Sequence, residues 1–236
     1  MHSLILDGGH LTWAHAIDHV RALEHDLRMQ PPPVWSPLTL TRVVLEGAAF
    51  TRYLYDPAIP LAQRLARCAG MCVTEALNEA KASHAFGPEE QQGAQQRQRE
   101  AKQLLDDADA VERRDRNGRN VIGYSIDGEY APLDHKIGPQ IKAFMPEWSA
   151  DAYPLLSGAA HGRPWMIARA RKPDGWGGEA ATVMAAIMVV MGAIEAGITV
   201  WGGYVGANVD KTLDQMEAAR LDFFRSSLAM AYPASQ

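Results

Sequence analysis

The chain has 236 residues, of which 47% are hydrophobic and 22% charged, close to the average of soluble globular proteins. This composition excludes a disordered tail, a collagen-like rod and a disulfide-rich miniprotein. Basic residues number 23 and acidic residues 28, so the formal net charge is -5. Dedicated nucleic-acid-binding domains usually have a pI above about 9. The acidic pI of about 5.9 therefore disfavours a nucleic-acid partner.

The chain has only two cysteines, Cys68 and Cys72, which lie four residues apart within a helical pattern. A disulfide between two thiols one turn apart on a helix would be strained. We therefore expect both to be reduced and packed as small apolar residues, as in a cytoplasmic protein. Residues 1–9 have no basic segment before their short apolar run, so a secretory signal peptide is not predicted.

Apolar residues recur with helical spacing along most of the chain. In chain order, we predict helices over residues 11–29, 36–55, 60–85 and 88–116, a β-hairpin over about 119–134, and further helices over 137–145, 149–161, 183–205 and 208–231. Ser36 followed by Pro37 is a typical helix start, because proline is well tolerated at the first helical position.

Two segments depart from this helical pattern. The helix over 88–116 is strongly polar with a narrow apolar seam, which indicates an exposed helix packed on one neighbour. Farther along, Asp127–Gly128 joins two β-prone runs, and this dipeptide is a strong hairpin signal. The sequence therefore predicts an all-α protein, a single helical-bundle domain over 1–236, in which the hairpin and the polar helix are additions rather than a second core.

The apolar helix over 183–205 is long enough to cross a bilayer and carries one charge, Glu195. The position of Glu195 mid-segment, the glycines, and the lack of Lys or Arg anchors near the ends all argue against a membrane span. We expect a buried helix of the bundle and no membrane association.

Common catalytic signatures are missing from the sequence, including phosphate-binding glycine loops, HExxH and paired CxxC motifs. His15 and His19 share one helix face, as two metal ligands do, but no second such pair completes the site. Asp106, Asp107 and Asp109 point in different directions on a helix, which favours a solvated surface. No metal site and no cofactor are therefore predicted.

One constellation of polar residues could carry chemistry. Arg42 and Glu46 lie one turn apart, and Tyr153, Ser157 and His161 follow one another at the same spacing on a second helix. Small residues around the second group would let a neighbouring helix approach and bring Glu46 within reach of His161. A carboxylate beside an imidazole orients it and raises its basicity, as acid–base catalysis needs. The same cluster could instead only lock the register of two helices.

Three stretches, residues 37–57, 61–67 and 153–165, resemble a family of uncharacterised bacterial helical proteins that is distantly similar to HEPN-type bundles. Many HEPN proteins are ribonucleases, toxins or phage-defence components. The resemblance implies a shared site made of Arg42, Glu46, Tyr153, Ser157 and His161. HEPN nucleases carry an arginine followed by a histidine with four to six residues between them, and this chain lacks that motif.

Two functions follow as hypotheses. In the first, the protein is an enzyme acting on RNA or a nucleotide as a toxin or defence component. His161 would be the general base, Glu46 would orient it, and Arg42 or Arg163 would hold the substrate's charge. The substrate would be bound by three further polar residues, Tyr153, Ser157 and Arg163.

In the second hypothesis, the protein is a non-catalytic bundle that binds a small apolar ligand or a protein partner. Its Met-, Trp- and Gly-rich helix over 184–206 would then line a cavity or the seam of a homodimer. Solvent access discriminates between the two hypotheses, since a sealed Glu46–His161 pair would favour the second.

Overall fold

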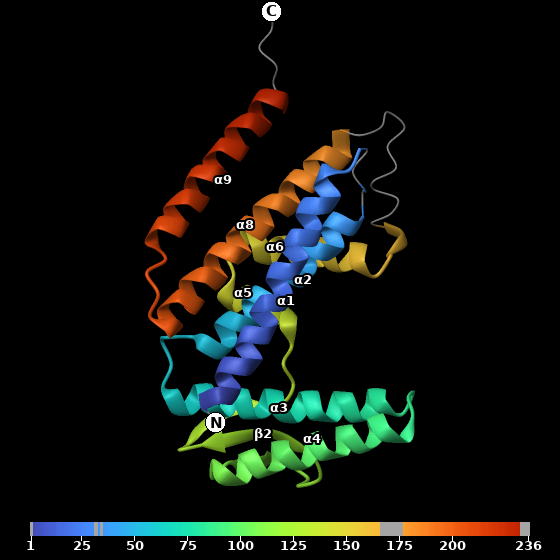
Figure 1. Cartoon of the computed structure of the whole chain (residues 1–236), viewed down its shortest axis with the longest axis vertical. Coiled ribbons are helices and arrows are strands. Elements are labelled where there is room, and N and C mark those ends of the chain that lie inside the picture. The colour runs from blue at the N-terminus through green and yellow to red at the C-terminus, as the bar shows by residue number, and fades with distance from the viewer. Residues whose placement is uncertain (1, 31–32, 34, 166–176, 232–236) are drawn as a thin grey trace, which may run out of the picture. The chain divides into compact units, whose positions relative to one another are not determined.

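A computed structural model describes the chain except for residues 1, 31–32, 34, 166–176 and 232–236. The described residues form eight helices and one three-stranded antiparallel sheet (Figure 1). In chain order these are α1 (His2–Arg28), α2 (Ser36–Tyr55), α3 (Leu61–Ser83), α4 (Pro88–Asp107), β1 (Val111–Arg114), β2 (Val121–Ile126), β3 (Glu129–Pro132), α5 (Ile137–Phe144), α6 (Glu147–Ala160), α8 (Gly177–Val205) and α9 (Asp210–Ala231). The prediction of a helical protein with a small β insertion is confirmed.

The chain divides into two compact units. The smaller contains Met1–His10 and Tyr53–Lys136, and the larger contains Leu11–Arg52 and Ile137–Gln236. Helices α1 and α2 each contribute residues to both units. Each unit also has its own cluster of buried apolar side chains, and the cluster of the smaller unit includes residues of the hairpin and of the polar helix.

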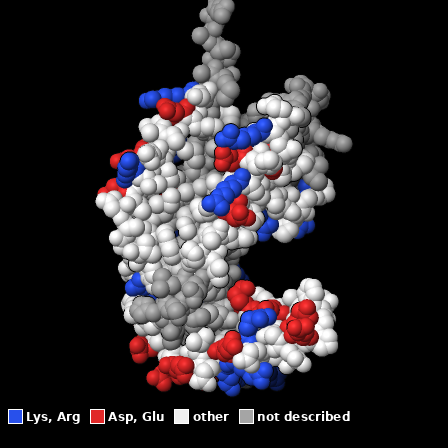
Figure 2. Space-filling view, viewed as in Figure 1, with Lys and Arg blue, Asp and Glu red and all other residues white. Residues whose placement is uncertain are grey.

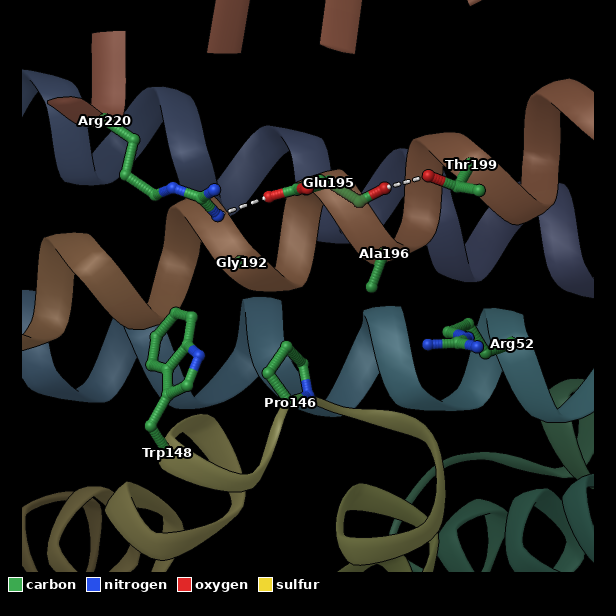
Figure 3. Close-up of a pocket in the computed structure, with 8 residues that line it drawn as sticks. All are labelled: Arg52, Pro146, Trp148, Gly192, Glu195, Ala196, Thr199 and Arg220. Atoms are coloured by element: carbon green, nitrogen blue, oxygen red, sulfur yellow. Dashed lines mark hydrogen bonds and ion pairs between the residues drawn. The ribbon is translucent and has the colours of Figure 1, made fainter. Parts of the chain in front are cut away.

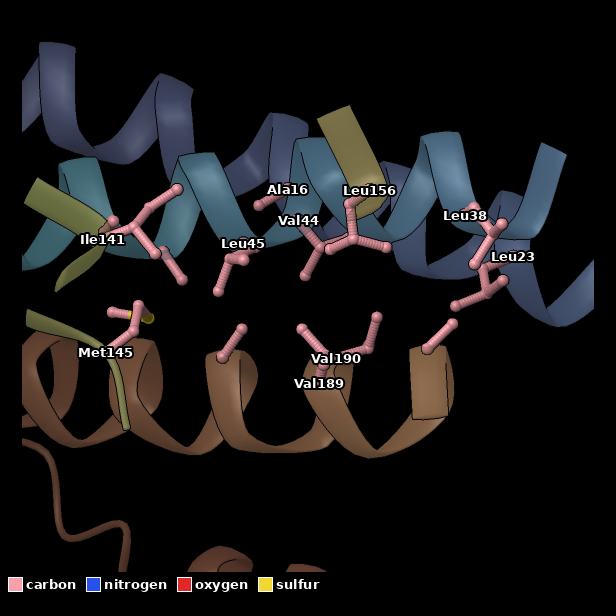
Figure 4. Close-up of a cluster of buried hydrophobic side chains, with 14 of the residues drawn as sticks. Ala16, Leu23, Leu38, Val44, Leu45, Ile141, Met145, Leu156, Val189 and Val190 are labelled. Atoms are coloured by element: carbon pink, nitrogen blue, oxygen red, sulfur yellow. The ribbon is translucent and has the colours of Figure 1, made fainter. Parts of the chain in front are cut away.

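The core of the larger unit is formed where α8 packs against α1, α2, α5 and α6. Figure 4 shows Val189 and Val190 of α8 facing Val44 and Leu45 of α2 across this core. Each of these four side chains is at least 95% removed from solvent. Their burial provides about 1.5–3 kcal/mol per large side chain, the main energy that holds these helices together.

Helix α8 also has the composition of a membrane span. Within the described residues, Met184–Val205 is the one helical stretch long and apolar enough to cross a bilayer by length and composition alone. In its most apolar window, 39% of the residues are buried inside the protein.

The smaller unit consists of α3 and α4 with the sheet, whose strand order is β1-β2-β3. Tyr124 and Ile126 of β2 pack with Ala66 of α3 and Leu105 of α4 in its apolar cluster. The hairpin turn between β2 and β3 has positive φ at both central residues, Asp127–Gly128 (49° and 85°). This conformation matches the twist of the two strands, and the predicted hairpin is confirmed.

The predicted helix over 88–116 is wrong at its C-terminal end. Helix α4 stops at Asp107, Asp109 adopts a left-handed conformation (φ 51°), and β1 then pairs with β2 so that Val111 lies opposite Ser125. The left-handed residue ends the helix, and the backbone of β1 gains partners on the edge of the hairpin. Long-range pairing of this kind overrides local helix propensity.

Helix α1 begins at His2, well before the predicted start at residue 11. Gly8 and Gly9 lie in this additional stretch of helix, where they permit close packing. A Cβ at Gly9 would overlap the Tyr55 side chain, and a Cβ at Gly8 would overlap Met71. Close approach to a neighbouring side chain therefore explains both glycines.

Candidate functional site

Two helices of the larger unit bring together four of the predicted site residues, named here the Arg42 cluster: Arg42, Glu46, Tyr153 and His161. The Arg42 Nε donates a hydrogen bond to Oε1 of Glu46 at 2.7 Å, and the Tyr153 hydroxyl donates to the same oxygen at 2.9 Å. The Nη1 of Arg42 lies 3.0 Å from Nε2 of His161. Arg42 therefore stands between the carboxylate and the imidazole.

The end of α6 determines where His161 lies. His161 is the C-cap residue, and Gly162 after it has a φ of +58°. The amide of Arg163 donates to the Gly158 carbonyl at 2.9 Å, and that of Gly162 donates to the Ala159 carbonyl at 3.0 Å. This bond pattern is a Schellman motif, which closes a helix through a left-handed glycine.

The contact with Arg42 assigns a role to one nitrogen of the His161 ring. A guanidinium group has only donors, so a hydrogen bond at this position runs from Nη1 of Arg42 to Nε2 of His161 as the acceptor. An accepting ring nitrogen is the atom that a general base uses to take up a proton.

Burial and the Glu46 carboxylate together shift the pKa values of Arg42 and Tyr153. Burial acts to lower the pKa of Arg42, but the hydrogen bond and charge of Glu46 outweigh it and raise that pKa above its ordinary value. Burial raises the pKa of the Tyr153 hydroxyl, and its hydrogen bond to Glu46 raises it further. Arg42 therefore stays charged and Tyr153 stays a donor at neutral pH.

The Arg42 cluster is open to solvent. His161 is exposed, and the side chains of Arg42 and Glu46 keep 19% and 28% of their accessible area. The Arg42 guanidinium also lies 5.8 Å from the centre of the Tyr153 ring. By the criterion of solvent access, this arrangement favours a reactive site over a sealed structural pair.

Not every sequence-predicted contact forms. Glu46 was expected to reach His161, but among the described residues it accepts hydrogen bonds from Arg42 and Tyr153, because the guanidinium lies between the carboxylate and the imidazole. Among the described residues, the Ser157 hydroxyl makes no hydrogen bond to the cluster; only its carbonyl accepts one, from the His161 amide. The side chain of Arg163 is exposed just beyond the helix end.

Sequence reasoning missed the role of Trp165. Its indole lies against Gly158, where an added Cβ would come within 2.6 Å of the ring, and half of the residue remains exposed. Gly158 is one turn before His161, so the exposed indole is close to the end of α6 that carries the histidine. The glycine one turn before the histidine was the available signal, because glycine permits a ring to approach a helix closely.

The histidine pair and the two cysteines offer fewer groups for catalysis or metal binding than the Arg42 cluster does. The His15 and His19 rings lie 4.3 Å apart, and His19 Nδ1 contacts the backbone oxygen of His15. No group of three metal-ligating side chains occurs in the part of the chain that the structure describes. Cys68 and Cys72 are free thiols, and a hydrogen bond from Cys68 lowers the pKa of Cys72.

Comparisons of the chain with protein-family models, curated proteins and solved structures find no match. The functional assignment therefore depends on the geometry of the Arg42 cluster.

Proposed function

We propose that the Arg42 cluster is the active site of a metal-independent, HEPN-like ribonuclease. The observation that carries the proposal is the 3.0 Å contact between Nη1 of Arg42 and Nε2 of His161 at a solvent-accessible surface. An imidazole beside a cation supplies the two groups that RNA cleavage needs, a base and a stabiliser of phosphate charge. The two residues come from different helices, which replaces a local arginine–histidine motif.

In the proposed reaction, Nε2 of His161 takes the proton of a ribose 2′-hydroxyl while the 2′-oxygen attacks the adjacent phosphorus. The bond between phosphorus and the 5′-oxygen of the next nucleotide breaks, and that oxygen takes a proton from water. The products are a 2′,3′-cyclic phosphate and a 5′-hydroxyl end. A positioned general base contributes about 10²- to 10⁴-fold to such a rate.

Arg42 has to release the imidazole before the base can act. The guanidinium has five N–H groups, of which one points to Glu46 and one to His161. When a phosphate arrives, Nη1 turns from Nε2 to a phosphate oxygen, because a charge-assisted bond to an anion is the stronger one. The Nε contact with Glu46 keeps the side chain in place during this exchange.

The surface supports recognition of a short, single-stranded substrate. On the face shown in Figure 2, acidic and basic side chains are interspersed over the described residues instead of forming a continuous basic stripe. Affinity then depends on local contacts, and the exposed indole of Trp165 provides a stacking surface for one base. An activity of this kind suits a toxin or a defence component that cleaves cellular RNA.

The test is cleavage of an end-labelled single-stranded RNA by the purified protein in the presence of EDTA. We expect 2′,3′-cyclic phosphate ends, no cleavage of the corresponding DNA, and a rate about 100-fold or more lower for His161→Ala. The matched control is His84→Ala, because His84 is also an exposed C-cap histidine, at the end of α3. Absence of RNA cleavage by the wild-type protein, or equal rates in both variants, would contradict the proposal.

A further inference from the structure

A pocket of about 250 Å³ lies in the larger unit, apart from the Arg42 cluster. It is enclosed by α2, α8, α9 and the segment where α6 begins (Figure 3). Its volume is slightly below the roughly 300–1,000 Å³ of pockets for drug-sized ligands, so it suits a small molecule. The lining consists of three charged residues, one hydroxyl and four apolar or small residues: Arg52, Glu195, Arg220, Thr199, Pro146, Trp148, Gly192 and Ala196.

Within the described residues, one cation of this pocket, Arg52, has no counterion. Arg52 is partly buried, and its Nη1 donates to the neutral carbonyl of Phe144 at 2.5 Å. Throughout the described parts of the chain, no carboxylate lies within ion-pair distance of Arg52. Partly buried charges are normally paired, because desolvation penalises an uncompensated charge. The pocket therefore offers one positive charge that an anion can neutralise.

The second arginine of the pocket is already neutralised. Arg220 of α9 forms ion pairs with Glu195 of α8, at 2.8 Å, and with Glu217. With Glu195 and Glu217 both paired to Arg220, Arg52 is the cation of the lining that is left for a ligand. A single negative charge on the ligand is enough to neutralise it.

The wall between the charged groups is apolar and flat. The Trp148 indole packs on Gly192, where an added Cβ would lie 2.5 Å from the ring, and 42% of Trp148 remains exposed. Figure 3 shows Pro146 between Trp148 and Arg52, with the Arg52 guanidinium pointing toward Pro146 and Ala196 projecting from α8 above. A planar apolar body fits against the indole and the proline ring while its charged end reaches Arg52.

We infer that this pocket binds a small aromatic monocarboxylate. The carboxylate takes the open N–H groups of the Arg52 guanidinium, whose planar fork matches two carboxylate oxygens. The aromatic ring lies against Trp148 and Pro146, where an offset or edge contact is favourable. This inference is independent of RNA cleavage, since no residue of the Arg42 cluster lines the pocket.

Isothermal titration calorimetry with benzoate as the probe tests the inference. We expect saturable binding of benzoate at one site, affinity about tenfold or more lower for the neutral isostere benzamide, and no tighter binding of inorganic phosphate. Failure of benzoate to bind, or equal affinities for benzoate and benzamide, would overturn the inference.

Substitutions inside and outside the pocket test where benzoate binds. Arg52→Gln should weaken benzoate binding about tenfold or more, while Arg28→Gln, an exposed arginine paired with Glu24 outside the pocket, should leave it unchanged. Because Arg52 also holds the Phe144 carbonyl, Ala196→Leu provides a second variant that fills the pocket and leaves Arg52 intact. Circular dichroism checks that both proteins fold. Wild-type benzoate affinity in Ala196→Leu would place the binding elsewhere and overturn the inference.

Discussion

Nη1 of Arg42 lies 3.0 Å from Nε2 of His161, although 119 positions separate the two residues in the sequence. The contact exists because α2 and α6 pack in the same core and because α6 ends at His161. An arginine–histidine pair made in this way has no fixed spacing along the chain. The pair can be recognised only once the positions of the two helices that carry it are known.

The first prediction concerns the planar geometry of the Arg42 guanidinium. Arg42→Lys keeps the positive charge but loses the Nε donor to Glu46 and the planar fork that spans Glu46 and His161. We expect the rate of RNA cleavage to fall about 100-fold, the size typical of losing one oriented donor to a developing oxyanion. Arg28→Lys, at an exposed arginine also paired one turn away with a glutamate, is the control. Single-turnover kinetics that show equal losses in both variants would contradict the role of Arg42.

The second prediction concerns Tyr153, which positions Glu46 through a 2.9 Å hydrogen bond. Tyr153→Phe removes this bond and should lower kcat about tenfold at an almost unchanged KM, with a stability loss of about 1 kcal/mol. Tyr130→Phe is the matched control, since the Tyr130 hydroxyl donates to the Ile122 carbonyl in the hairpin. Both variants should lose similar stability in urea unfolding. If they also keep the same kcat, Tyr153 has no part in the reaction.

The third prediction tests whether the helix end positions His161. Gly162→Ala places a Cβ at a φ of +58° and should cost about 1–2 kcal/mol of folding free energy. Gly206→Ala is an ideal comparison, because Gly206 has a φ of +70° with no atom within 4 Å of the added Cβ. We expect similar stability losses, but loss of RNA cleavage only for Gly162→Ala. Full activity in a folded Gly162→Ala protein would show that the Schellman motif is dispensable.

Local sequence signals predicted most of the helices and one half of the site, the Arg42–Glu46 pair. Spacing of four residues places Arg42 beside Glu46 because both lie on one turn of a helix, and Asp127–Gly128 specifies its hairpin turn through its positive φ values. The third strand, β1, could not be predicted, because its partner β2 is formed later in the chain and its own residues have no strong β preference.

The features of the fold and of the site that the sequence did not predict depend on tertiary packing. The sequence placed Glu46 near His161, but nothing in the spacing showed that the longer arginine side chain would lie between them. The residues that line the pocket around Arg52 come from four separate parts of the chain, so no local sequence pattern predicts the pocket. Gly8 and Gly9 of α1 mark places where other side chains approach, which depends on which elements become neighbours.

The fourth prediction addresses the packing of α8. A Cβ at Gly197 would overlap the ring of Trp13, which is 8% exposed in the core of the larger unit. Gly197→Ala should therefore destabilise the protein by about 1–3 kcal/mol through overpacking. Gly203→Ala, on the same helix with no atom within 4 Å of the added Cβ, should stabilise it by up to about 1 kcal/mol. Thermal unfolding that shifts both variants in the same direction would contradict this contact between α1 and α8.

The fifth prediction concerns His135 in the smaller unit, whose ring packs edge-on against Tyr53 with 5.3 Å between centroids. Burial lowers the pKa of His135 below its ordinary 6.5; the nearby Asp134 opposes this effect and Arg67 adds to it. The unfolded chain therefore binds a proton at this position more readily than the folded chain does. Stability from the neutral ring is fully present above about pH 6.5 and is lost as the pH falls through the lowered folded-state pKa.

Urea unfolding between about pH 7.5 and pH 5 measures this effect, because most carboxylates remain ionised over that range. We expect the wild-type free energy of unfolding to decrease on acidification and His135→Gln to show a smaller decrease, since glutamine takes up no proton. The exposed His84 serves as the control, because His84→Gln should keep the wild-type slope. An unchanged slope in His135→Gln would mean that another group causes the acid sensitivity, since by linkage only a group with different pKa values in the folded and unfolded chain can produce one.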